Sequence, residues 1–129
     1  MYRETIKLET QKDSCTNITN LVNKAVKNSK VKEGMCNIFL PATTAGLTLN
    51  EDDILLNADF LRQFKKIDEN KIYSHPNNAF SHLRAAMARQ DMNIPVTKNA
   101  LSLGTWQSIL LWEFDTKERE REIVVTVVE

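Results

Sequence analysis

The amino-acid sequence predicts an α+β fold, in which a mixed or antiparallel β-sheet is combined with three helices in a single domain. Two kinds of pattern support this prediction. Three segments carry apolar residues at helical spacing, and several others alternate between apolar and polar residues as half-buried strands do. Strands follow one another in the last third of the chain. Its 129 residues contain no repeat, linker or low-complexity tract, so one domain covering 1–129 is expected.

The first third of the chain predicts a strand, a helix and a second strand. Residues 2–10 alternate as a strand does, although Glu4 interrupts the apolar side. Residues 17–29 are expected to form a helix, because their apolar residues recur at i, i+3, i+4, i+7 and i+8. The second strand, 35–40, ends before Pro41.

A passage of small residues, 42–46, leads into a short strand at 47–49. The acids at 51–53 then begin a second helix, where negative charge suits the positive helix end. Its expected buried face comprises Ile54, Leu55, Ala58, Leu61, Ile67 and Phe64 or Phe60. A third helix, from 79 to an end between 89 and 93, has an apolar stripe formed by Ala79, His82, Leu83, Ala86 and Met87.

The last third of the chain predicts strands. A short strand is expected on each side of Pro95, and longer ones at 106–114 and 122–128, joined by a turn over 115–121.

Composition excludes several classes of protein. Seventeen basic and seventeen acidic residues give zero net charge, so no nucleic-acid partner is expected. The longest apolar runs, 109–112 and 123–125, are far shorter than a membrane span, and the N-terminus lacks a signal-peptide pattern. A cytoplasmic protein without a membrane partner is therefore expected. Cys15 and Cys36 should then stay reduced, and their isolation gives neither a zinc ribbon nor a redox motif.

Two polar clusters are candidates for binding an ion. His75 and His82 lie within eight residues, so their imidazoles could bind a metal or an anion; the alternative is one surface and one partly buried histidine. Thr43 and Thr44 precede Gly46, and such a turn can hold a phosphate. The alternative is that the two threonines are simply β-branched residues at the edge of a strand.

Two further clusters are open to two interpretations. The segment 103–107 contains a glycine, a hydroxyl, an indole and an amide in succession, and it could line a pocket, although Trp106 could equally belong to the core. The charged run 117–122 fits a solvated turn, from which one arginine could still reach a ligand.

These clusters, in this order and spacing, resemble the YjbQ family of small bacterial and archaeal proteins, often labelled secondary thiamine-phosphate synthase. The resemblance covers nearly the whole chain. It is most specific over 103–107, and other matching positions are Thr43, Thr44, Ala45, Asn50, Glu51, Asp59, His75, Asn78, His82, Leu83, Glu113, Phe114, Asp115 and Arg121.

The resemblance implies a homotrimer with a pocket near the subunit boundary. Several members of the family resemble metal-binding proteins through their histidines. The family label implies joining a pyrimidine diphosphate to a thiazole phosphate with loss of pyrophosphate, and hence a role in thiamine biosynthesis.

Two departures from the family pattern bear on its chemistry. Ala42 stands where the family usually has a histidine, and Phe80 stands where it has an acid. Two histidine ligands then remain instead of three, so binding of a divalent metal, Zn or Mn, should be weakened unless Glu51, Asp59 or Cys36 replaces the missing ligand. The family's usual glycines are also absent near Arg89 and at Ala100, as is its Gly-Pro-Arg at 116–119.

The expected site residues fall into three groups. The catalytic group is Glu51 as base, Asp59 as its support, and His82. The substrate-binding group is Thr43, Thr44, Thr105 and Arg121 for the anion, Trp106 for stacking, and Gln107 and Asn78 for polar edges. The metal group is His75 and His82, which could instead hold a phosphate. The hypothesis is a weak thiamine-phosphate synthase-like enzyme that binds a small phosphorylated heterocycle; the alternative is a non-catalytic metabolite-binding relative.

Overall fold

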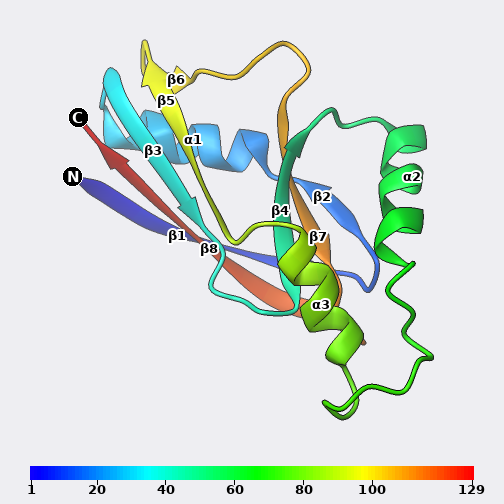
Figure 1. Ribbon diagram of the computed structural model, residues 1–129. Coiled ribbons are helices and arrows are strands. Elements are labelled where there is room, and N and C mark those ends of the chain that lie inside the picture. Colours follow the sequence, from blue (N-terminus) through cyan, green and yellow to red (C-terminus); the bar gives the residue numbers. More distant parts are fainter.

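The computed structural model describes all 129 residues and contains two antiparallel sheets and three helices (Figure 1). The helices are α1 (Thr19–Ser29), α2 (Ile54–Phe64) and α3 (Ala79–Met87). The strands are β1 (Tyr2–Thr10), β2 (Cys15–Asn17), β3 (Glu33–Phe39), β4 (Ala45–Asn50), β5 (Asp91–Thr97), β6 (Ala100–Leu101), β7 (Ser108–Glu113) and β8 (Arg119–Val128). The predicted α+β class with three helices is confirmed.

Neither sheet follows the order of the chain. The larger sheet has the order β1-β8-β3-β5-β6, and the smaller one the order β2-β7-β4. In the larger sheet β8 lies between β1 and β3, so Tyr2 pairs with Val127 and the two chain ends lie side by side (Figure 1). In the smaller sheet Ala45 pairs with Glu113, and Asn50 pairs with Ser108.

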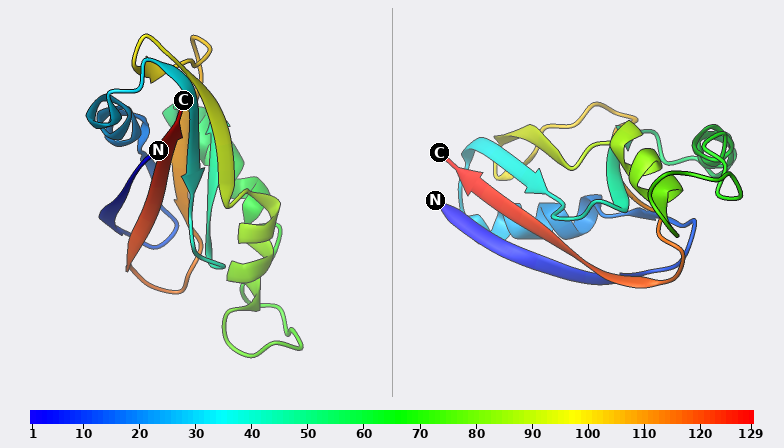
Figure 2. Two further views of the ribbon diagram at one scale, coloured as in Figure 1. Left: turned by 90° about the vertical axis from the view of Figure 1, so that its left-hand side faces the viewer. Right: turned by 60° about the horizontal axis from the view of Figure 1, so that its bottom comes forward.

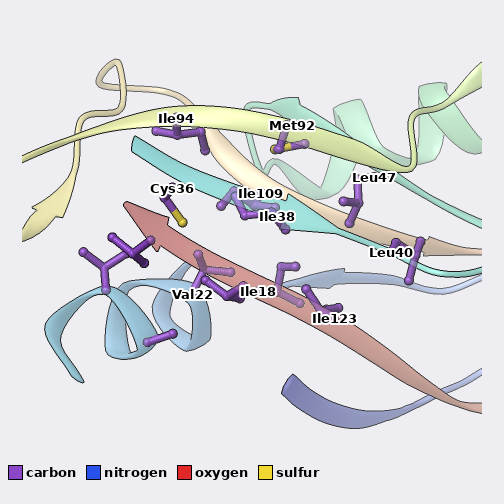
Figure 3. Packing of buried hydrophobic residues seen from close by; sticks show 14 of the residues in the cluster. Ile18, Val22, Cys36, Ile38, Leu40, Leu47, Met92, Ile94, Ile109 and Ile123 are labelled. Carbon is purple, nitrogen blue, oxygen red and sulfur yellow. The ribbon is translucent and has the colours of Figure 1, made fainter. Parts of the chain in front are cut away.

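The main core lies between the two sheets and α1. In α1 the predicted stripe buries Val22, Ala25 and Val26, which pack with inward-facing residues of β3, β5, β8, β4 and β7 (Figure 3). Strand β7 alternates between two cores. Ile109 and Leu111 face the main core, while Leu110 and Trp112 belong to a second cluster with Phe64 of α2. This strand is therefore buried on both faces.

Helices α2 and α3 lie at the end of the molecule away from the chain termini (Figures 1 and 2). Asp53 caps α2 by accepting a hydrogen bond from the Leu56 N–H at 2.9 Å, which confirms that the acidic segment starts this helix. No helix of the fold is both long and apolar enough to cross a membrane.

The predicted buried face of α2 is largely wrong. Ile54 and Leu55 are 84% and 75% exposed, and only Phe64 is fully buried. Helical spacing identifies an apolar stripe, but it does not say whether the same chain covers that stripe. Two turns of apolar surface therefore remain open on this helix.

Helix α3 is turned away from its predicted orientation. Leu83 is 44% exposed and Met87 is 70% exposed, whereas Arg84 is 1% exposed. The Arg84 guanidinium donates two hydrogen bonds to the Ile67 carbonyl, at 3.0 and 2.8 Å, and lies 4.8 Å from the centre of the Phe80 ring. These contacts replace part of the water that the charge gives up on burial; Nη1 has no hydrogen-bond partner and lies 3.9 Å from Asp13 Oδ1.

The region around Pro95 differs from the expected two short strands. Pro95 lies within β5, opposite Met35 of β3. Its carbonyl accepts a hydrogen bond from the Ser102 N–H, on the side of β5 that faces away from β3. The nitrogen of a strand residue points to the same side as its carbonyl, so the missing N–H of proline removes no bond to β3.

Candidate functional site

A network of buried polar side chains lies where β4 begins and β7 ends. Its centre is Glu113, which is fully buried although it carries a carboxylate. Arg121 of β8 donates to both oxygens of Glu113, from Nε at 2.7 Å and from Nη2 at 2.5 Å. The Thr10 hydroxyl of β1 adds a third bond at 2.6 Å. Three strands thus contribute to one paired charge.

The network continues from Arg121 to the Thr43–Thr44 turn. Arg121 Nη2 donates to the Thr44 hydroxyl at 2.8 Å, and that hydroxyl donates to Asp115 Oδ2 at 3.2 Å. Arg119 donates to the same Asp115 oxygen from Nε at 2.9 Å. The hydroxyl of Thr44 and the Nε and Nη2 groups of Arg121 are therefore engaged within the protein, whereas Nη1 of Arg121 has no partner in the chain.

Asp115 is 3% exposed and remains ionised in this network. Burial alone would raise the pKa of its carboxyl group. That effect is outweighed by the Thr116 N–H, the Arg119 guanidinium and the side-chain amide of Asn78, which together hold the pKa below its ordinary value. Asn78 occupies the N-cap position of α3, so Asp115 connects the β7–β8 turn to that helix start.

The two histidines converge beside this helix start. His75 lies in the segment between α2 and α3 and His82 lies on α3, with their ring centres 5.1 Å apart. The Nδ1–H of His75 donates to the Pro76 carbonyl at 2.8 Å. This bond leaves Nε2 of His75 as the ring nitrogen that is free to bind a ligand.

A cavity of about 310 Å³ lies next to His82. Its walls are Ala42, Thr43, His82, Ala85, Ala86 and Gln90. The amide nitrogen of Gln90 is engaged with the carbonyls of Ala45 and Ala85, at 3.2 and 3.1 Å. Thr43 is exposed and offers its hydroxyl to the cavity region, unlike its neighbour Thr44. The cavity brings His82 next to Ala42 and Thr43, which lie far from it in the sequence.

The remaining predicted residues lie at the opposite end of β4 and β7. Thr105, Trp106 and Gln107 directly precede β7, and Glu51 directly follows β4. Since Ala45 and Asn50 are five residues apart in one strand, the two ends of this ladder are about 17 Å apart. Trp106 is 72% exposed there, so it is not a core residue.

Asp59 does not join either group in one subunit. It lies on α2, is exposed, and forms an ion pair with Arg62 one turn further along. Within a single copy of the chain, ten of the eleven predicted residues therefore divide between two ends of the small sheet. Thr43, Thr44, His75, Asn78, His82 and Arg121 lie at one end, Glu51, Thr105, Trp106 and Gln107 lie at the other, and Asp59 lies on α2.

The side chains present do not fit a catalytic zinc ion, which takes three protein ligands and a water molecule. Two imidazoles meet at the cavity, but nowhere does the chain gather three His, Cys, Asp or Glu side chains that could hold a metal. Cys36 is fully buried in the main core, and Glu51 lies at the far end of β4. Neither can take the place of the histidine that Ala42 lacks.

Sequence reasoning did not assign a role to Glu113, Asp115, Arg119 or Thr10. The sequence did contain one indication of a polar network. Glu113 and Asp115 are charged residues at the end of the apolar run 109–112, where burial is expected. Their partners could not be found in this way, since Thr10 and Glu113 are 103 residues apart in the sequence.

Comparison with known proteins agrees with this arrangement of strands and motifs. The family model described as "UPF0047 protein YjbQ-like" matches residues 4–129. This chain belongs to the YjbQ-like UPF0047 family. The predicted family resemblance is thereby confirmed.

Members of this family come from both bacteria and archaea. A UPF0047 protein of Synechocystis is 31% identical, and the match covers 98% of this chain and 90% of that protein. YjbQ of Salmonella typhimurium is 32% identical, with 98% and 96% covered. None of these names states an activity.

Two crystal structures have the same fold. One is an uncharacterised YjbQ/UPF0047 protein of Clostridium acetobutylicum, which is 36% identical with a TM-score of 0.91, covering 97% of this chain and 99% of that one. The other, from Sulfolobus solfataricus, is 30% identical with a TM-score of 0.88, covering 97% and 96%. It is described as a YbjQ-like protein of unknown function.

Proposed function

We propose that this protein is a homotrimer that binds a small phosphorylated heterocycle in pockets between its subunits. The observation that carries the proposal is the division of the candidate site. The cavity beside His82 and the segment Thr105–Gln107 lie at opposite ends of the β4–β7 ladder in one copy, and that ladder is about 17 Å long. A neighbouring copy that presents its Trp106 to the cavity would complete the site.

Exposed apolar surface supports assembly. Leu55, Met87 and Trp106 are 75%, 70% and 72% exposed, and water contact at such side chains is unfavourable. An apolar groove of about 330 Å³ runs along α2 and α3, with Phe60, Phe64, Ile67 and Met87 in its wall. Burial of these side chains against a second copy would stabilise the assembled protein.

The polar groups at the cavity suit an anionic ligand. The hydroxyl of Thr43 and the imidazole of His82 are donors for a phosphate, and His75, whose Nδ1–H is bound to Pro76, donates to it from Nε2 only as an imidazolium, which would also add charge. The Thr44 hydroxyl and Arg121 Nη2 bond to each other and so hold the Thr43 turn in place, which leaves Arg121 Nη1 as a further donor for the anion. Trp106, Gln107 and Thr105 of the neighbouring copy would stack on the ring and bind its polar edge.

Two outcomes of ligand binding are open to this site. In the first, the protein has thiamine-phosphate synthase-like activity, joining a pyrimidine diphosphate to a thiazole phosphate with loss of pyrophosphate, with Glu51 as base and Asp59 beside it. The second is a binding protein without turnover, and Ala42 and Phe80 favour it. Phe80 is 3% exposed and packs against Arg84, so that position offers no acid to the site.

The mass of the assembly and the binding of ligand test the proposal together. Light scattering after gel filtration should give three subunits, and thiamine monophosphate should shift the ring resonances of His82 in an NMR titration. The variants His82→Ala and Trp106→Ala should each weaken that binding. A monomer, or a ligand that binds both variants as tightly as the unmodified protein, would contradict the interface pocket.

Turnover is measured separately. The pyrimidine diphosphate and the thiazole phosphate are incubated with the protein, and thiamine phosphate and pyrophosphate are followed. Release of both products at a rate that Glu51→Gln lowers would support the enzyme. Binding without product would support the binding protein.

A further inference from the structure

Glu113 is a carboxylate that the packing of the chain does not require. It lies in β7 on the same side as Ile109 and Leu111, where it is fully buried. A buried ion pair loses the hydration of both charges and often stabilises a fold no better than an apolar pair of similar volume. Glu113 and Arg121 form such a pair, with Arg121 Nη2 2.5 Å from Glu113 Oε2.

The pair adds side-chain links between the end of β7, the start of β8 and the turn that precedes β4. Arg121 bonds Glu113 on one side and the Thr44 hydroxyl on the other. Glu113 Oε2 also accepts the Asp115 N–H at 3.0 Å, which fixes the backbone of the β7–β8 turn. A second link joins the same two segments, because the Phe114 N–H donates to the Thr44 carbonyl at 3.0 Å.

From Asp115 the network reaches the start of α3. Its carboxylate binds the Thr44 hydroxyl, and the Asn78 side chain donates to it. Thr44 precedes β4 and follows Thr43 in the cavity wall, while Asn78 begins the helix that carries His82. Asp115 thus lies beside the segments that carry both walls of the cavity.

We infer that Glu113 and Arg121 are positioning residues that fix the Thr43–Thr44 turn and the start of α3 relative to each other. The pair acts through Thr44 and Asp115, and it sets the spacing between the Thr43 hydroxyl and His82. This inference rests on the proposed anion site, but the placement of the two walls is measurable without any ligand.

A neutral double variant, Glu113→Gln with Arg121→Met, separates positioning from stability. The amide retains acceptors for the Thr10 hydroxyl and the Asp115 N–H, and no unpaired charge remains. Lys7→Gln with Glu122→Gln is the matched control, because that ion pair is exposed on the larger sheet at 3.8 Å. Both proteins are expected to unfold cooperatively.

The first readout is the apo protein. Backbone amide shifts of Thr43 and Thr44, the Asn78 side-chain amide shifts and the His82 ring shifts should move in the Glu113–Arg121 variant and stay in place in the control. The second readout is a titration with inorganic phosphate, followed through His82. Phosphate should bind the variant roughly tenfold more weakly than the unmodified protein, as the loss of one well-placed donor implies.

The outcomes separate the inference from the proposed function. A folded variant with unchanged apo shifts overturns positioning, as does phosphate affinity within about twofold of the unmodified protein. If the unmodified protein binds no phosphate, the anion site fails, and the apo shifts alone then decide the inference. If the variant does not fold, Thr44→Val removes the same link from the other side, and the same two readouts apply to it.

Discussion

Restoring a histidine at position 42 should create a metal site. Ala42 lines the same cavity as His82, whose ring lies 5.1 Å from that of His75. In Ala42→His, a third imidazole would therefore enter a cavity that is lined by His82 and has His75 close to that histidine. Zinc-finger peptides bind zinc with about 10–16 kcal/mol from four ligands, or about 3 kcal/mol a ligand. We expect zinc to bind the variant roughly 100-fold more tightly than the unmodified protein.

Calorimetric titration of the apo proteins with zinc measures this difference. Ala100→His is the matched control, because Ala100 is also half-buried in a groove but lies beside α1, far from the other histidines. Combining His75→Ala with Ala42→His should abolish the gain, since a two-histidine site remains. One site per subunit is expected in Ala42→His.

Two results would refute the reasoning. Equal zinc affinity in Ala42→His and Ala100→His would mean that the cavity does not hold its histidines in a geometry suited to a metal. Tight binding by the unmodified protein, at one ion per subunit, would mean that another group already completes the site. In the second case the assay for turnover should be repeated with zinc and with manganese.

Three further changes test other parts of the structure. Arg84→Ala should lower the free energy of unfolding by about 3 kcal/mol, because it removes a buried donor, whereas the exposed Arg89→Ala should change it little; urea denaturation measures both. Because the pKa of Asp115 is lowered in the folded protein, its carboxylate stabilises the fold at pH values above the ordinary pKa of 3.8. This stabilisation is lost as the pH falls below that value. Asp115→Asn should therefore be destabilised at pH 7, and its deficit should shrink in acid; equal deficits at both pH values would contradict this. Leu55→Lys combined with Met87→Lys should yield folded monomers by light scattering, and an intact trimer would place the interface elsewhere.

Local patterns were enough to predict much of the fold. The stripe in α1 and the alternation in β1 each depend on neighbours in the sequence, and the structure confirms both elements. Pro95 misled the prediction, because only the pairing of β5 with β3 and β6 shows that its nitrogen lies on the side away from β3.

The candidate site was less accessible to sequence reasoning. The motifs indicated which residues to consider, but not that β4 and β7 hold them at opposite ends. The Glu113 network was missed because its partners come from strands that pair only in the folded protein. Thr10 lies near the start of the chain and Arg121 near its end. The apolar faces of α2 and α3 show a limit of another kind. Periodicity identifies an apolar face that is expected to be buried, but no other part of the chain buries Leu55 or Met87.

The length of the β4–β7 ladder determines which residues each subunit would contribute to a pocket. Strand β7, which is buried on both faces, is a rigid spacer, so in the proposed assembly each copy would give its histidine end to one pocket and its tryptophan end to another. In a closed ring the pockets then equal the subunits in number, and each pocket draws on two chains. Mixing His82→Ala chains with Trp106→Ala chains should thus regenerate some intact pockets, although neither parent has any. Defects at the two ends would complement each other between chains, whereas two defects at one end would not.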